Sequence, residues 1–295
     1  MRVIKVFILV SILLGTLYSC SPLKKTGSSE TTALASYANQ NYQQAYSQLL
    51  AVINNYKSAN QQVPYEVYLK TAHSASQLGN ASSAIQYYAE ALKDSLTVDA
   101  VKDYLLNMNK LGNTTQINAA INKYSDFLSS NGQGAYLVNQ QFYQALLANN
   151  DSAIAVLYPQ LNSTNEEQSL AYLNALENTD KNKEALLFAN KLLSDNPSYL
   201  KAKEWKAVHY YNKAEDQYQS LMDAYNKDKN YTTYVYLKRD LKKVTEDFKQ
   251  SRELFEDLRK VNSTEKKYIK YLKNIYLRLE MKREAAAMEA LLADG

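Results

Sequence analysis

The most restrictive feature of this chain is a helical pattern that returns at a nearly constant spacing. One apolar helical face ends before Gly79-Asn80 and another begins after it, and the same arrangement surrounds Gly112-Asn113, 33 residues later. Residues three and four apart share a helix face, so each unit is predicted to form two helices joined by a turn. A period of about 20 to 50 residues is typical of solenoids, in which each unit buries its apolar face against the next.

The apolar positions of successive units have the same phase. In the clearest unit they are Tyr68, Ala72 and Ala75 in the first helix, then Ala84, Ile85, Tyr88, Ala91 and Leu92 in the second. In the next unit they are Val101, Leu105 and Met108, then Ile117, Ile121 and Tyr124. The small residues fall where two paired helices approach most closely, and the large residues fill the space between the helices.

This spacing resembles the tetratricopeptide repeat (TPR) over residues 31–197 and 264–293, although Leu96 stands where the repeat usually closes with Pro. The resemblance implies an all-α fold, a TPR-like α-solenoid of stacked antiparallel helix pairs with a concave groove lined by the first helices. Only 7 Gly and 4 Pro interrupt the 295 residues. That is too few turn-forming residues for a many-stranded sandwich or barrel.

A longer helical hairpin is predicted near the C-terminus, over residues 198–261. From Ser198 to Asp294 there is no Gly or Pro, and residues 226–230 provide a polar turn between two apolar seams. Each seam steps by three and four residues, which is typical of two long packed helices. Asn262, with Glu265 three residues later, predicts a capping box that opens a last helix pair.

The first residues have the features of a signal peptide. Arg2 and Lys5 precede an apolar run, residues 6–14, which is too short to span a bilayer as a mature helix. Leu17-Tyr18-Ser19-Cys20 then resembles a bacterial lipobox, although Tyr18 is bulkier than usual at its place. A plain secretory signal that ends near a Cys is the alternative.

The lipobox resemblance implies that Cys20 is acylated and becomes the mature N-terminus. It further implies an envelope protein of a two-membrane bacterium, and Ser21 rather than Asp favours the outer membrane over the inner one. Pro22–Thr31 has no apolar period and is predicted to be a flexible tether. The predicted organisation is a signal peptide (1–19), a tether from Cys20 (20–31), TPR-like repeats (32–197), a long charged helical hairpin (198–261) and a C-terminal TPR-like helix pair (262–295).

Charge gives little support for a general polyanion binder, because 34 basic and 30 acidic residues leave a net charge of +4. The formal net charge is −3 in residues 20–200 and +5 in residues 201–295. The basic part is either a docking surface for an anionic partner or lipid headgroups, or a solvated face whose opposite charges pair four residues apart. Those pairs are Lys242/Glu246, Lys243/Asp247, Lys249/Glu253, Arg252/Glu256 and Glu256/Lys260.

No motif for catalysis or for a metal is present in the sequence. Two His and one Cys cannot build a structural zinc site, and His209 has no metal-ligating residue at a suitable spacing. No nucleotide-binding glycine pattern or hydrolase motif occurs. We therefore expect no enzyme activity, no metal and no cofactor apart from acyl chains on Cys20. A hydrolase with a carboxylate site at Glu166-Glu167 or Glu215-Asp216 remains an alternative, but adjacent side chains on a helix point apart.

Tyrosine is unusually abundant, with 26 Tyr against 6 Phe and 1 Trp. Aromatic rings with a polar tip are favoured at binding surfaces, so a glycan- or peptide-binding module is a second alternative. Most of these tyrosines, however, occupy the apolar phase of their helices, and this favours a role in the core or at the groove edge. Trp205 is interpreted in the same way, as a packing residue.

The sequence favours a non-enzymatic, periplasm-facing outer-membrane lipoprotein that acts as a protein–protein interaction scaffold. Its partners are expected to be envelope proteins or their peptide segments and, through the lipid anchor, the membrane, but not nucleic acid. No oligomeric state is implied. The repeat phase places a partner-binding groove on the first helices. The groove residues are Glu66, Leu69, His73, Ser76 and Gln77, then Lys102, Leu106, Asn109 and Lys110, and then Leu170, Asn174, Glu177 and Asn178.

Overall fold

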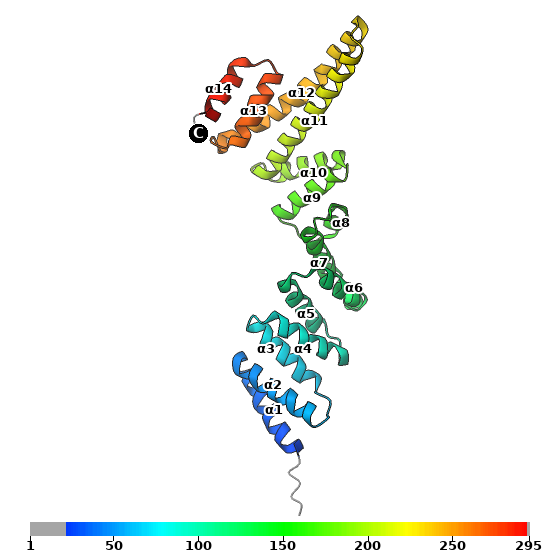
Figure 1. Ribbon diagram of the computed structural model, residues 1–295, viewed down its shortest axis with the longest axis vertical. Helices are drawn as coiled ribbons and strands as arrows, with labels where there is room; N and C mark the ends of the chain where they lie inside the picture. Colours follow the sequence, from blue (N-terminus) through cyan, green and yellow to red (C-terminus); the bar gives the residue numbers. More distant parts are fainter. Residues whose placement is uncertain (1–21, 294–295) are drawn as a thin grey trace, which may run out of the picture. The chain divides into compact units, whose positions relative to one another are not determined.

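The computed structural model describes residues 22–293, and the regular structure of this part is entirely helical (Figure 1). The helices up to the middle of the chain are α1 (Pro22–Ala38), α2 (Tyr42–Ser58), α3 (Tyr65–Gln77), α4 (Ala81–Asp94), α5 (Val98–Leu111), α6 (Thr114–Ser130) and α7 (Gly134–Leu147). The others are α8 (Asp151–Leu157) with the 3-10 turn Tyr158–Gln160, α9 (Glu166–Asn178), α10 (Asn182–Asp195), α11 (Leu200–Lys227), α12 (Tyr231–Val261), α13 (Lys266–Arg278) and α14 (Lys282–Ala293). The all-α fold predicted from the sequence is confirmed.

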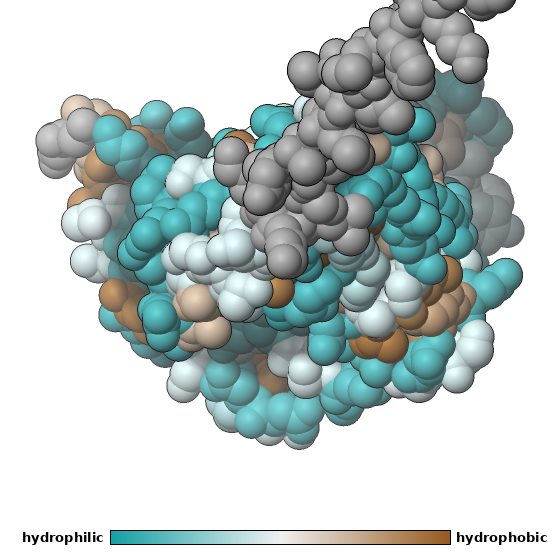
Figure 2. Space-filling view, turned by 90° about the horizontal axis from the view of Figure 1, so that it is seen from below, coloured by the Kyte–Doolittle hydropathy of each residue, from teal (hydrophilic) through white to brown (hydrophobic). Residues whose placement is uncertain are grey.

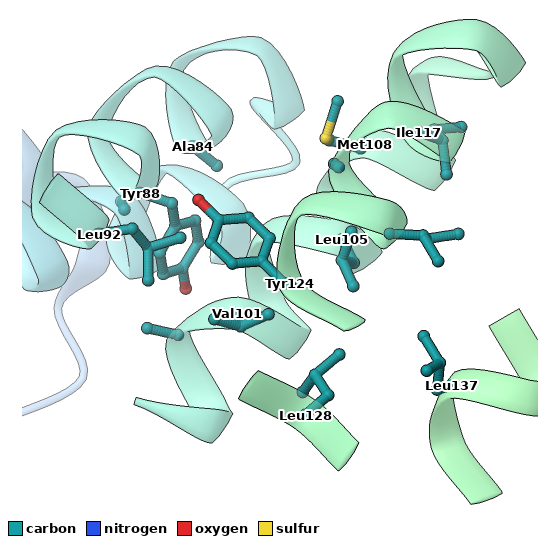
Figure 3. Close-up of a cluster of buried hydrophobic side chains, with 14 of the residues drawn as sticks. Ala84, Tyr88, Leu92, Val101, Leu105, Met108, Ile117, Tyr124, Leu128 and Leu137 are labelled. Carbon is teal, nitrogen blue, oxygen red and sulfur yellow. The ribbon is translucent and has the colours of Figure 1, made fainter. Parts of the chain in front are cut away.

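The chain divides into two compact units, and the division falls within α7, between Leu137 and Val138. In the first unit, α1 packs on α2, α3 on α4, and α5 on α6. Small and large apolar side chains from successive pairs converge in one core, which Figure 3 shows around Tyr88, Leu105 and Tyr124. This packing of each pair on the next is the TPR-like repeat expected from the sequence.

The second unit continues with pairs of the same kind, α9 with α10 and α13 with α14. Between them, α11 and α12 form a hairpin of 28 and 31 residues, which confirms the longer hairpin near the C-terminus. Its seam is buried at Val244, Phe248 and Phe255, and α13 packs on it through Leu272 and Ile275.

Hydrogen bonds between helices show the repeat period directly. Tyr136 donates to the carbonyl of Lys102 over 34 residues, and Tyr199 donates to the carbonyl of Glu166 over 33. Between α11 and α13 the separation is 63 residues, as in the bond from Arg278 to Glu215. The helices that begin successive pairs, α9, α11 and α13, are therefore neighbours in space. The long hairpin increases the sequence separation between α11 and α13 but does not keep them apart.

Asparagine begins many of the helices. An N-cap side chain satisfies one of the backbone N–H groups that has no partner inside the helix. In each case the Asn side chain accepts from the backbone N–H three residues later. These N-caps are Asn41, Asn80, Asn113, Asn150, Asn165 and Asn230.

Two predictions at helix boundaries are wrong. Residues 22–31 are not a tether, because they form the first part of α1. Tyr56 of α2 donates a hydrogen bond of 2.6 Å to Glu30, and Ala33 is fully buried, so packing on α2 orders a segment without an apolar period. Asn262 does not cap α13, because its backbone N–H closes the end of α12 and Glu265 is the N-cap.

The charged side chains of α12 pair differently from the expected four-residue spacing. Glu246 pairs with Lys249, and Asp247 pairs with Lys213 of α11. Of the five expected pairs only Arg252 with Glu256, at 3.4 Å, is present. Lys242 and Lys243 therefore lack the ion pairs that the sequence pattern assigned to them.

The surface of the described residues is polar in most places. Figure 2 shows mainly hydrophilic residues on the face that it presents, with hydrophobic residues in small separate areas. Between Pro22 and Ala293, no helix is both long enough and apolar enough to cross a membrane.

Candidate functional site

The first helices of three successive pairs in the second unit, α9, α11 and α13, enclose a surface hollow of about 430 Å³. We call it the first-helix hollow. Its lining residues are Leu170, Asn174 and Glu177 from α9, Lys201, Glu204, Trp205 and Val208 from α11, and Lys267 from α13. Three of the four groove residues predicted on α9 thus come together here with residues of the long hairpin.

Glu177 is held in place by two rings of the next first helix. Its Oε2 accepts a hydrogen bond of 3.0 Å from Nε1 of Trp205, and its Oε1 lies 3.5 Å from Nδ1 of His209. The two rings are stacked with centroids 5.0 Å apart, and both side chains are buried. Because both carboxylate oxygens have a partner, the wall of the hollow has a defined shape before any partner binds.

The carboxylate of Glu204, which lines the same hollow from α11, also has partners inside the protein. Lys267 pairs with its Oε1, and the Tyr268 hydroxyl donates to its Oε2 at 2.8 Å. Burial, followed by this hydrogen bond, raises the pKa of Tyr268 to about 12. Asn174 and Lys201, by contrast, are exposed and have no hydrogen bond or ion pair within the described residues. They are the polar groups of the hollow that are available to a partner.

A second hollow, of about 670 Å³, lies against Glu177 from the side of α10. We call it the α10–α11 hollow. It is lined mostly by polar side chains: Asn182, Lys183 and Leu186 from α10, and His209, Asn212, Lys213, Asp216 and Gln217 from α11. Glu177 therefore lines both hollows, and the sequence offered no signal for the second one.

In the first unit, His73 is a partnered side chain rather than a solvated one. Its Nδ1 lies 3.0 Å from the hydroxyl of Tyr37, and its Nε2 lies 3.2 Å from the amide nitrogen of Gln77. The ring edge of Tyr42 packs against it, with centroids 5.6 Å apart. Burial lowers the pKa of His73. The cluster joins α1, α2 and α3 and has a structural role.

The other predicted groove residues of the first unit lie on α3 and α5 without forming a described hollow. Glu66 pairs with Lys70 at 3.2 Å, and Ser76 donates to the side chain of buried Asn107 at 3.0 Å. Leu69 and Asn109 are half-buried, and Leu106 and Lys110 are exposed. The amino group of Lys102 lies 5.0 Å from the ring centroid of Tyr136.

Asn178, the last predicted groove residue, lies outside the first-helix hollow. Its amide donates to Asp151 of α8 at 2.8 Å. Sequence reasoning also missed Lys201, Trp205 and Lys267, because groove residues were predicted only on repeats before the long hairpin and not on the hairpin or the C-terminal pair. The repeat phase could have found them, since α11 and α13 begin successive pairs like α9.

Tyrosines in the apolar phase of the repeat helices pack against other side chains of the protein. Tyr68, Tyr88 and Tyr124 are buried, and the ring of Tyr172 stacks on Tyr158 with centroids 4.3 Å apart. None of the residues that line the first-helix hollow is a tyrosine. The packing interpretation is therefore supported over a cluster of tyrosines in the groove.

The acidic pairs considered for hydrolysis have other partners. Arg278 binds Glu215 through two nitrogens, and Asn196 donates to Glu166 at 3.2 Å. Within residues 22–293 no group of three metal-ligating side chains could hold a metal ion. Cys20 lies outside the described residues.

No protein-family model matches the sequence, and no curated protein does. Similar solved structures include a tetratricopeptide repeat protein from Parabacteroides merdae, 14% identical with a TM-score of 0.43, over 85% of this chain and 99% of that one. A TPR repeats protein from Bacteroides fragilis is 10% identical with a TM-score of 0.33, over 85% and 98%. The TPR2AB domain of yeast Sti1 in complex with pHSP90 is 14% identical with a TM-score of 0.36, over 86% and 84%. The description of this chain as TPR-like rests on its own helix pairs.

Proposed function

We propose that this protein is a non-enzymatic scaffold that binds other proteins through the first-helix hollow. The observation that carries the proposal is that three first helices, which are far apart in sequence, build one preformed recess. A recess of this kind can receive an extended segment or one turn of a helix from a partner. Its shape is set by Glu177 and Glu204, whose carboxylates are already bonded inside the protein.

The chemistry of the hollow suggests what such a segment contains. Leu170, Val208 and Trp205 offer an apolar contact area, while Asn174 and Lys201 offer hydrogen-bond donors at the edge. An apolar side chain next to a backbone carbonyl or a carboxylate matches this arrangement. The alternating signs of Glu177, Lys201, Glu204 and Lys267 add no strong overall field, so shape rather than charge selects the partner.

The proposal includes a location. The signal peptide and the lipobox at Leu17-Tyr18-Ser19-Cys20 support an acylated protein of the outer membrane that faces the periplasm. Its partners are then other envelope proteins. An acylated amine together with a thiol carrying acyl chains provides more than one chain, which is what stable anchoring requires.

A site-specific cross-link tests the groove. A photo-activatable amino acid at Asn174, which is exposed at the hollow, is expected to give one discrete cross-linked protein in the native envelope. The matched control is the same amino acid at Asn190, which is exposed on α10, a second helix. Leu170→Arg is expected to abolish the Asn174 product. The same product from Asn190, or no product from Asn174, would argue against the scaffold.

The location has its own test. Labelling of the cells with palmitate is expected to label the protein, and Cys20→Ser is expected to remove the label and release the protein from the outer-membrane fraction. Protease added to intact cells should leave the protein whole, whereas permeabilised cells should not protect it. Digestion in intact cells would place the protein on the cell surface instead.

A further inference from the structure

The end of the long hairpin contains the charge excess of the whole chain. We call residues 224–243 the hairpin tip; it comprises the end of α11, the turn and the beginning of α12. The tip has six basic and two acidic residues, a net charge of +4, which equals the net charge of the complete sequence. The remaining residues are therefore balanced, with 28 basic and 28 acidic side chains. The positive charge of this protein is thus localised.

Most of the basic side chains of the tip form no ion pair or hydrogen bond within the described residues. Arg239 pairs with Asp240 at 2.8 Å. Lys227, Lys229, Lys238 and Lys242 are exposed and have no ion pair or hydrogen bond within the described residues. The carboxylates of the nearby Glu246 and Asp247 pair with Lys249 and Lys213 instead. The tip is therefore a cationic surface and not a charge-balanced solvated face.

The same tip exposes aromatic and apolar side chains. Tyr231 is 82% exposed, Tyr234 46%, Val235 44% and Tyr236 52%, and all four belong to the first six residues of α12. Isolated exposed apolar residues are normal, but four within six residues of one helix form a patch. The guanidinium of Arg239 lies over the ring of Tyr236, 5.1 Å from its centroid.

Within the described residues, the ring contacts and polar contacts of this patch lie inside the hairpin itself. Every ring contact, hydrogen bond and ion pair of the tip is formed within the hairpin, such as the ring contact between Tyr225 and Tyr234. One hollow includes a single tip residue, Leu241, and its other hairpin residues, such as Met222 and Val244, lie outside the tip. In Figure 1 the yellow end of α11 and α12 extends past α13 and α14. The tip thus projects from the second unit.

We propose that the hairpin tip docks on an anionic phospholipid surface, with the lysines at the headgroup phosphates and the tyrosine rings at the interface. Lysine clusters beside a membrane attract anionic lipids, and tyrosine is enriched where hydrocarbon meets water. A projecting tip without a concave recess can bind a lipid surface, because a bilayer adapts to the shape of the protein that contacts it. An acidic protein would instead need a complementary contour, and Leu241 is the single tip residue that lines any of the four hollows found within residues 22–293. The tip shares no residue with the first-helix hollow, so it could hold a scaffold against a membrane while the hollow binds a partner.

The test labels one new cysteine, which is possible because the sequence has a single native cysteine that can be replaced. In a full-length chain with Cys20→Ser, a new Cys at Thr232, an exposed tip residue, is labelled with an environment-sensitive fluorophore. Vesicles of phosphatidylethanolamine and phosphatidylglycerol are expected to shift the emission to shorter wavelength, and vesicles of phosphatidylcholine alone are not. The matched control carries the label at Ala287, which is exposed on α14, and is expected to show no shift. Because the readout is local, binding through the N-terminal residues does not mimic it.

Charge removal completes the test. Lys238→Gln with Lys242→Gln is expected to weaken the partition of the labelled tip into anionic vesicles roughly 30-fold, and added salt should weaken it too. Lys282→Gln with Arg283→Gln, which removes the same charge from α14, should leave it unchanged. The absence of a shift at residue 232 with anionic vesicles overturns the proposal and favours an acidic protein as partner. An equal shift at residue 287 also overturns it.

Discussion

The indole Nε1 of Trp205 donates a hydrogen bond of 3.0 Å to Oε2 of Glu177, which lies 28 residues earlier in the chain. This bond joins two first helices, and Glu177 lines both the first-helix hollow and the α10–α11 hollow. Trp205 is buried and its ring stacks on His209, so its N–H has little access to water as an alternative partner.

Glu177→Ala is expected to destabilise the second unit by about 1–3 kcal/mol, because a buried donor loses its acceptor. Glu177→Gln keeps an acceptor oxygen and should cost less. Denaturant unfolding measures both. Glu167→Ala, an exposed residue of the same helix, is the control and should change stability by less than about 0.5 kcal/mol. Equal losses of unfolding free energy in Glu177→Ala and Glu177→Gln would show that the hydrogen bond from Trp205 contributes nothing to stability.

Phe255→Ala is expected to cost about 3–5 kcal/mol, because it removes a fully buried ring and leaves a cavity. The ring of Phe255 stacks on Tyr271 of α13 with centroids 4.6 Å apart, so the loss should also loosen α13. Thermal unfolding and hydrogen exchange of α13 report the two effects. Leu187→Ala, at a side chain that is 70% exposed, is the control. A loss as small as that of Leu187→Ala would contradict this packing.

Gly112→Ala is expected to destabilise the first unit by about 1–2 kcal/mol, because Gly112 ends α5 with φ of 70° in the left-handed region. A Cβ would meet nothing within 4 Å, so backbone strain is the only cost. Gly134→Ala is the matched control. Its Cβ would also meet open space, but without a positive φ, so the change should be neutral or stabilising by up to about 1 kcal/mol. Similar values for both variants would rule out the conformational explanation.

Stability should fall at alkaline pH. Burial, followed by a hydrogen bond to a glutamate, raises the pKa of both Tyr268 and Tyr276 from the usual 10.0 to about 12. The unfolded chain therefore loses these protons first. The contribution of the two tyrosines is complete below pH 10 and is lost as the pH rises through about 12.

Denaturant unfolding at a series of alkaline pH values measures how steeply the free energy of unfolding falls with pH. Tyr268→Phe with Tyr276→Phe should flatten the decline, because the two groups no longer titrate. Tyr231→Phe, at an exposed ring, is the control and should leave the slope unchanged. An unchanged slope in the double variant would show that other groups cause the alkaline loss.

Much of the fold could be predicted from the sequence because its signals are local. Asn80 and Asn113 mark helix starts, and the apolar phase around Tyr88 and Leu105 identifies the buried faces. The candidate site was harder to predict from the sequence. Leu170, Asn174 and Glu177 were on the predicted face. Trp205, from the predicted hairpin, and Lys267, from the predicted C-terminal pair, complete the hollow, and no groove residue had been assigned to either segment.

The sequence alone determined which residues are helical over most of the chain, since capping and periodicity act within a few residues of each other. Tertiary structure decided the rest, because long side chains pair according to which helix lies beside them. Asp247 is four residues from Lys243, yet it pairs with Lys213 across the hairpin seam. Packing on α2 likewise turned a segment without an apolar period into the start of α1. The neighbours that supply such contacts are defined only once the helices have packed, and the same packing leaves the lysines of the hairpin tip unpaired.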